Sequence, residues 1–173
     1  MEAKNEVKFR EVQRFGNWVW GVAGFTGVMV IAAMAVVISA EMSSGRKAGG
    51  EGMTVLFMGL AAAIVVGVDG LLIMARLITE VRGDGVYVRF FPFHFSFWEI
   101  SLEDVVKVEA RRYRPIREYG GWGIRWVRKG RAYNMRGNMG VRIDYADGRH
   151  FLIGSQRSKE LAEAVEEVLK GRA

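Results

Sequence analysis

The chain has 173 residues and a mass of 19.4 kDa, which is enough for about one ordinary domain. It has a net charge of +6 and a mean hydropathy of +0.08 although 25% of its residues are charged, so its apolar residues must be concentrated in one part of the chain. The lack of cysteine excludes a disulfide framework, a thiolate metal site and a cysteine nucleophile, and two histidines leave little scope for a histidine metal site or Ser-His catalysis.

Residues 1–15 form a basic N-terminal flank that also carries apolar side chains. Val7, Phe9, Val12 and Phe15 stand among lysines and arginines. Two interpretations of this flank stay open. It forms a short amphipathic helix in the membrane interface, or it is a solvated basic segment that only sets the membrane topology.

Two long apolar segments follow the flank. Residues 16–40 carry no charge, and this length corresponds to a helix of roughly 37 Å, enough to cross a hydrocarbon core of ~30 Å. Residues 53–76 form a second such segment, in which Asp69 is the only charge before Arg76. The polar, glycine-rich residues 41–52 between them are predicted to be a short loop. A signal peptide is disfavoured by the length of the first segment, and two core helices are disfavoured because too few residues remain to cover them.

The distribution of basic residues predicts the orientation of these spans. Lysines and arginines precede the first segment and follow the second, at the ends away from the 41–52 loop. The two basic residues of that loop are opposed by two glutamates. The positive-inside rule therefore places the N-terminus and the C-terminal domain in the cytoplasm of a multi-pass protein of the cell membrane. Trp18 and Trp20 are expected at the cytoplasmic interface.

Small residues recur along both spans and predict a tight antiparallel helical hairpin, with contacts to further copies in a homo-oligomer. They are Gly21, Ala23, Gly24 and Gly27 in the first span and Gly59, Ala63, Gly67 and Gly70 in the second. The simple abundance of glycine and alanine in membrane spans is the alternative explanation.

Asp69 is a candidate intramembrane polar site, because an unpartnered carboxylate at its depth costs on the order of 1–3 kcal/mol. Arg14, Asn17 or a tryptophan indole of the first span is its expected partner. A functional role and a structural hydrogen bond between the helices both stay open.

Beyond Arg76 the apolar period changes from helical to two, which predicts about seven short strands. Turns are expected at Gly83-Asp84-Gly85, at 101–104 and at Asp147-Gly148. In the aromatic run 90–98, alternation predicts that one face fills the core while Phe90, His94 and Trp98 lie on the other. The strand candidates are 77–81, 86–90, 91–97, 105–110, 124–127, 131–135, 141–145 and 150–153.

One amphipathic helix ends the chain. Ser158 is its expected N-cap, Gly171 lies beyond its end, and its predicted buried stripe consists of Leu161, Val165, Val168 and Leu169. The predicted fold class is therefore α+β: a two-helix transmembrane hairpin followed, over residues 77–173, by a bent antiparallel sheet or small barrel closed by a C-terminal helix.

Several motifs between residues 113 and 165 resemble a known group of proteins. They include 119–125 (Tyr-Gly-Gly-Trp-Gly-Ile-Arg), Ala132-Tyr133, Gly140-Val141, Asp147-Gly148 and 153–157 (Ile-Gly-Ser-Gln-Arg). Together with two preceding spans, they are similar to uncharacterised prokaryotic membrane proteins with a bacterial PH-like domain. This resemblance implies a PH-like fold and a membrane location, and it implies no activity.

Residues 111–131 are the strongest functional feature, with eight basic residues against Glu118 alone, a net +7. Arginine forms bidentate bonds to phosphate, and tryptophan suits a membrane interface or a protein interface. Binding of anionic lipid headgroups, recognition of a protein partner, and simple solvation around a glycine turn with Trp122 in the core all stay open. The candidate binding residues are Arg112, Arg114, Arg117, Trp122, Arg125, Trp126 and Arg128.

No catalytic motif is recognisable, and we expect no enzymatic activity, cofactor or metal. Nucleic-acid binding is disfavoured because the chain has no RNP-type or helix-turn-helix pattern and is tethered to a membrane. The predicted function is a membrane-anchored binding or scaffolding module. The alternative is a small oligomeric transport or channel subunit that uses Asp69.

Overall fold

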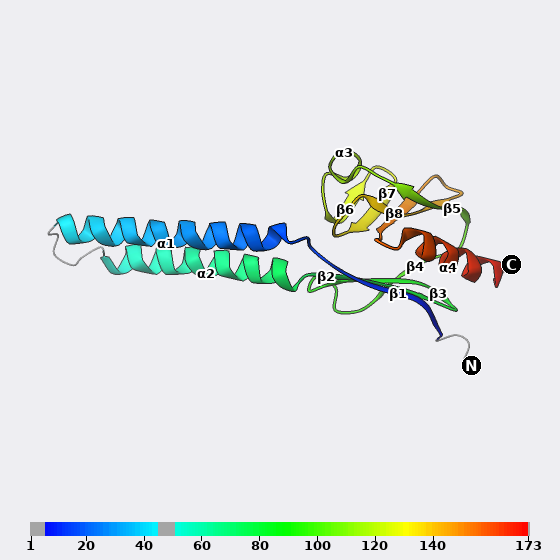
Figure 1. The fold of residues 1–173 in the computed structure, drawn as a ribbon, viewed down its shortest axis with the longest axis horizontal. Coiled ribbons are helices and arrows are strands. Elements are labelled where there is room, and N and C mark those ends of the chain that lie inside the picture. The colour runs from blue at the N-terminus through cyan, green and yellow to red at the C-terminus, as the bar shows by residue number, and fades with distance from the viewer. Residues whose placement is uncertain (1–5, 45–50, 173) are drawn as a thin grey trace. The chain divides into compact units, whose positions relative to one another are not determined.

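A computed structural model describes residues 6–44 and 51–172 (Figure 1). The chain divides into two compact units. We call residues 16–44 and 51–74 the helical pair, and residues 6–15 and 75–172 the strand-rich unit. Each is described by itself.

The helical pair consists of α1 (Trp18–Ser44) and α2 (Glu51–Met74). Within it, Trp18–Ala40 and Met53–Met74 are long and apolar enough to cross a membrane, and the most apolar stretch of each helix contains no buried residue. Such exposure suits a bilayer and not the core of a water-soluble protein. The predicted loop 41–52 is shorter than expected, because α1 continues to Ser44 and α2 begins at Glu51; residues 45–50 lie outside the described residues.

The glycines of the two helices do not mediate the close packing that we predicted from their spacing. A Cβ atom added at Gly21, Gly24, Gly27, Gly59, Gly67 or Gly70 would meet no neighbouring heavy atom within 4 Å. The other helix therefore does not closely approach any of these six glycines. Association into a homo-oligomer stays a prediction.

The strand-rich unit contains two sheets and, over the described residues, no closed barrel (Figure 1). The first sheet is antiparallel, with the order β1 (Val7–Arg14), β2 (Arg76–Arg82), β3 (Gly85–Phe91) and β4 (Trp98–Ile100). The second has the order β5 (Val105–Arg112), β8 (Met139–Tyr145), β9 (His150–Gly154), β7 (Gly130–Asn134) and β6 (Gly123–Val127).

This arrangement departs from the bent antiparallel sheet or small barrel that we expected. β7 pairs parallel to β9, and the other strand pairs of the second sheet are antiparallel. The α+β class is confirmed, whereas a PH-like fold stays a prediction. Two shorter helices complete the unit, α3 (Pro115–Tyr119) and α4 (Ser158–Lys170).

The N-terminal flank is a strand, so both of our interpretations of residues 1–15 are wrong for its described part. β1 pairs with β2 from Val7↔Arg82 to Arg14↔Arg76. Its alternation buries Phe9 and Gln13 and exposes Val12. The pairing joins residues more than 60 positions apart, which no local pattern indicates.

Polar side chains of β1 also bind the last residue of β9 and the two residues that follow it. The Gln13 amide donates to the Gly154 carbonyl at 2.6 Å. The Glu11 carboxylate accepts from the Ser155 hydroxyl at 2.5 Å and from the Gln156 N–H at 3.0 Å. β1 is therefore held by both sheets.

The core lies between the two sheets and under α4. α4 contributes Leu161, Val165 and Val168, as its amphipathic pattern predicted. Ser158, however, is the first residue of α4 and is buried, and no side chain caps the helix, so the N-cap prediction is wrong.

The strand that we predicted at 91–97 does not form. β3 ends at Phe91, and Pro92, which has no N–H to donate, begins a turn. The predicted faces are also wrong, since Phe90 is buried in the core while Phe93 and Phe95 are 63% and 82% exposed.

Candidate functional site

The glycine-rich stretch after α3 forms a tight turn with a defined hydrogen-bond pattern. Gly120, Gly121 and Gly123 have φ values of 71°, 124° and 109°, a region that side chains disfavour. The Gly120 N–H donates to the Ile116 carbonyl at 3.0 Å and the Gly121 N–H to the Pro115 carbonyl at 2.9 Å, which closes the end of α3. The stretch therefore returns the chain sharply from α3 into β6.

Trp122 in this turn is half-buried and belongs to neither core cluster. Its indole N–H donates to the Gly137 carbonyl at 3.2 Å. This contact ties the turn to the loop between β7 and β8. Trp122 is thus placed to hold the turn, and a role in binding stays a prediction.

A small second core anchors α3 to the outer face of the second sheet. Tyr113 and Tyr119 are buried there against Ala132 and Leu152. Burial raises the pKa of Tyr113 to about 12. This packing therefore holds α3, a helix of only five residues, against the sheet.

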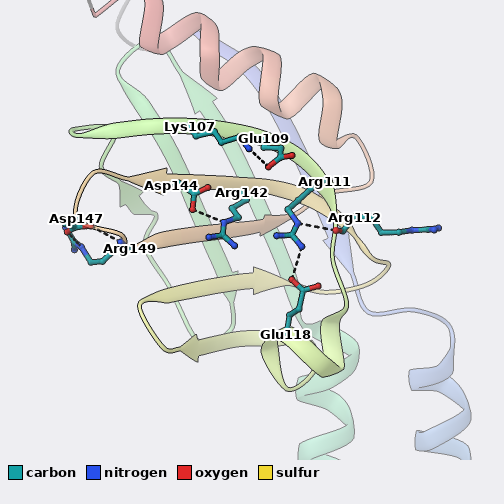
Figure 2. Close-up of polar contacts among 9 residues, drawn as sticks. All are labelled: Lys107, Glu109, Arg111, Arg112, Glu118, Arg142, Asp144, Asp147 and Arg149. Carbon is teal, nitrogen blue, oxygen red and sulfur yellow. Dashed lines mark hydrogen bonds and ion pairs between the residues drawn. The ribbon is translucent and has the colours of Figure 1, made fainter.

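Most charged side chains around this face are paired (Figure 2). Lys107 binds Glu109 at 2.9 Å, Arg142 binds Asp144 at 2.8 Å, and Arg149 binds Asp147. Such exposed pairs contribute little to stability because water screens the attraction between the charges. Their consequence for function is that these basic groups are already partnered.

Glu118 is the single acidic residue of the 111–131 segment, and both of its carboxylate oxygens have a partner. One Glu118 oxygen binds Arg111 at 3.0 Å, and the other accepts the Arg114 backbone N–H at 2.7 Å. Arg111 was not among our candidate binding residues, and its ion pair with Glu118 makes it less available to a ligand. Among the described residues, no carboxylate oxygen lies within 4.0 Å of a side-chain nitrogen of the five candidate arginines, Arg112, Arg114, Arg117, Arg125 and Arg128.

The candidate residues fall into two places. Arg112, Arg114 and Arg117 are exposed at the α3 end of the sheet, where α3 contacts β6, and there Arg125 donates its Nε–H to the Trp122 carbonyl at 2.9 Å. Ile116, between Arg114 and Arg117 in the chain, is 68% exposed. We call Arg112, Arg114, Ile116, Arg117 and Arg125 the arginine surface.

Trp126 and Arg128 lie toward the other end of the β6–β7 hairpin, and Trp126 lines a cavity that we did not foresee. This inter-sheet cavity of about 490 Å³ is bounded by β4 and the loop after it on one side and by β6–β7 and β8–β9 on the other. Its volume is within the range of small-molecule sites, roughly 300–1,000 Å³. No local signal marks it, because its walls come from both sheets.

An arginine held between aromatic rings marks one wall of the cavity. The Arg131 guanidinium lies 5.1 Å from the centroid of Trp98 and 5.8 Å from that of Trp126. These contacts position the guanidinium without a carboxylate.

Two further cavity residues have perturbed pKa values. Burial raises the pKa of Tyr145 to about 12, and its hydroxyl donates to the Ser101 carbonyl at 2.8 Å. Burial, followed by repulsion from Arg142, lowers the pKa of His150 below its usual 6.5. Across residues 6–44 and 51–172, no group of three or more acidic, histidine or cysteine side chains is arranged to hold a metal ion.

Asp69 has a partner that the sequence did not suggest. The Thr26 hydroxyl of α1 lies 2.6 Å from Asp69 Oδ2 on α2. Thr26 was not among the partners that we expected for Asp69, which were Arg14, Asn17 or an indole of the first span. The carboxyl group is therefore engaged between the two helices.

The arrangement of the described residues, two apolar helices and then two sheets and a C-terminal helix, was compared with known proteins. Residues 1–170 match a family described as "Family of unknown function (DUF6141)". The chain belongs to this family. No curated protein and no solved structure was found to match it.

Proposed function

We propose that this DUF6141 protein is a membrane-anchored, non-enzymatic recognition module whose arginine surface docks onto anionic phospholipid headgroups. The observation that carries the proposal is the set of candidate arginines without a carboxylate partner, beside a sheet face whose other charges are paired. Guanidinium groups with free N–H donors suit phosphate oxygens. Ile116, exposed between Arg114 and Arg117 in the chain, adds an apolar contact of the kind found in interfacial binding.

The helical pair supplies the anchor. Because β1 precedes α1, β2 follows α2, and the two strands pair, both flanks of a membrane-spanning pair lie on one side of the bilayer. The basic residues of these flanks favour the cytoplasmic side, where anionic lipids are concentrated. Tethering keeps the arginine surface at a high local concentration of its ligand.

The expected strength follows from the number of free charges. Each basic residue near an anionic leaflet contributes about 1 kcal/mol. Replacing Arg112, Arg114 and Arg117 by glutamine therefore removes about 3 kcal/mol, roughly a 100-fold change in the docking equilibrium. High salt is expected to weaken docking because these side chains are exposed.

The test uses the full chain in nanodiscs. The protein has no cysteine, so Ile116→Cys creates one site for an environment-sensitive fluorophore. We expect higher, blue-shifted emission in nanodiscs with about 30% phosphatidylglycerol than in phosphatidylcholine alone. The gain should disappear in the Arg112→Gln/Arg114→Gln/Arg117→Gln variant.

Two controls separate docking from general effects of charge and labelling. The Lys159→Gln/Lys170→Gln/Arg172→Gln variant removes the same charge from exposed positions elsewhere and should keep the gain. A fluorophore at Val106→Cys, also exposed, should report none. Equal emission in both lipids would refute lipid docking. If the arginine variant then also lost a crosslinked protein, the surface would recognise a protein partner instead.

For Asp69 we propose a structural role, with the Thr26–Asp69 hydrogen bond joining α1 to α2. A transport role would require a chain of polar groups along the helices. The contact supports a fastening of the hairpin and does not favour the transport alternative.

A further inference from the structure

The inter-sheet cavity presents unpaired charges of both signs. Lys129 and Arg131 line one side, and Glu99, Glu103 and Asp104 come from β4 and the loop that follows it. Within the described residues, none of these five side chains has an opposite charge within 4.0 Å. This distinguishes them from most charged side chains of the neighbouring sheet face, including Arg149, which Asp147 already binds.

Arg131 is arranged to bind an oxyanion. Trp98 and Trp126 hold the guanidinium through cation–π contacts at 5.1 and 5.8 Å. Such contacts use the faces of the planar group and leave most N–H donors at its edge available. Donors fixed before the ligand arrives lose little conformational entropy on binding. A phosphate or carboxylate group is the natural partner.

The acidic residues of the cavity determine the charge of the ligand's second group. A simple anion on Arg131 and Lys129 would be repelled by Glu103 and Asp104, whereas the Glu99 carboxylate lies on the other face of β4, beside Gly85. A ligand with a cationic group on its other end satisfies both walls. Carboxylates accept hydrogen bonds, so they favour a primary ammonium, which donates three, over a quaternary ammonium, which donates none.

We propose that the inter-sheet cavity binds a small zwitterion, with its oxyanion on Arg131 and Lys129 and its primary ammonium on Glu103 and Asp104. Phosphoethanolamine and the headgroup of phosphatidylethanolamine share this chemistry. The site is independent of the arginine surface, which lies at the α3 end of the sheet. Docking to anionic lipid and binding in the cavity can therefore fail separately.

The test is isothermal titration calorimetry of the full chain in maltoside micelles, which carry no charged headgroup, with phosphoethanolamine as the probe. We expect binding at about one site per chain, and binding of inorganic phosphate, ethanolamine or phosphocholine at least roughly 10-fold weaker. Glycerophosphoethanolamine, which carries the lipid's phosphodiester, distinguishes the sources. Tighter binding of this diester would indicate a lipid headgroup, and tighter binding of the monoester a free metabolite.

Matched variants identify the wall that each end of the ligand uses. Arg131→Gln should weaken phosphoethanolamine binding roughly 10-fold or more. Lys129→Asn is the second variant, because Lys129 is an exposed turn residue with φ of 64°, a conformation that asparagine tolerates without unfolding the hairpin. Glu103→Gln/Asp104→Asn should abolish the preference for phosphoethanolamine over phosphate. Lys107→Gln, whose residue is paired on the outer face, should change nothing.

Three results would overturn the assignment. They are absence of binding at 10 mM phosphoethanolamine, roughly equal affinity for phosphoethanolamine and phosphate in the native chain, and unchanged affinity in both Arg131→Gln and Lys129→Asn. Loss of lipid docking in the Arg112/Arg114/Arg117 variant would leave cavity binding intact.

Discussion

Phe9→Ala tests the assignment of the N-terminal segment to the strand-rich unit. Phe9 is 5% exposed and belongs to the main core cluster. A buried phenylalanine covers about 150–250 Å², and at about 25 cal/mol per Å² its burial contributes roughly 4–6 kcal/mol. Alanine keeps a small part of this, so we expect a loss of about 3–5 kcal/mol, the usual range for such a substitution. Arg157, 4.9 Å from the ring centroid, loses its cation–π contact as well.

The assay is urea unfolding of the full chain in maltoside micelles, followed by tryptophan fluorescence. With a slope of about 1–3 kcal/mol per M, the midpoint for Phe9→Ala should fall by on the order of 2 M. Val12→Ala is the matched control, because Val12 lies on the same strand but is 47% exposed, and it should change stability by less than about 0.5 kcal/mol. If both variants unfolded at the native midpoint, residues 7–14 would not be part of the core and the reasoning would be refuted.

Two further predictions concern the helical pair and the cavity. Thr26→Val removes the hydroxyl beside Asp69. It should destabilise the helical pair by about 0.6 kcal/mol, at most about 1.7, in detergent-titration unfolding, whereas Thr26→Ser should keep the native stability. Equal loss of stability in both variants would indicate that Thr26 acts through packing and not through the hydrogen bond. His150 should titrate below pH 6.5 in the folded chain by NMR. As the pH falls, the unfolded chain protonates His150 before the folded chain does, so the stability present above about pH 6.5 is lost below that pH. His150→Gln should therefore reduce the change in unfolding free energy between about pH 7 and pH 5. The same pH dependence in the variant and the native chain would contradict this.

Elements with a strong local pattern could be predicted from the sequence. The uncharged apolar run identifies α1, and the 3.6-residue spacing of Leu161, Val165 and Val168 identifies α4 and its buried face. The hairpin between β8 and β9 follows from Asp147-Gly148, where Gly148 has φ of 79°. In each case residues within a few positions of one another determine the conformation, so no distant partner needs to be known.

The candidate site could be predicted only in part. The excess of arginine in residues 111–131 is visible in the sequence, but the pairing that removes Arg111 from the free charge depends on where α3 places Glu118. The Trp98–Arg131 contact joins the two sheets, and Thr26 lies 43 residues before Asp69. Neither pair has a spacing that any periodicity would connect.

The sequence by itself therefore determined the two long apolar helices, the turns, the C-terminal helix and the location of excess positive charge, because period and turn chemistry act over a few residues. The tertiary structure decided that residues 7–14 form a strand, that β7 pairs parallel to β9, and which charges remain unpartnered. A strand can satisfy its backbone hydrogen bonds only with another strand, and a charge is neutralised only by what approaches it in space. Both depend on the distant segments that folding brings together.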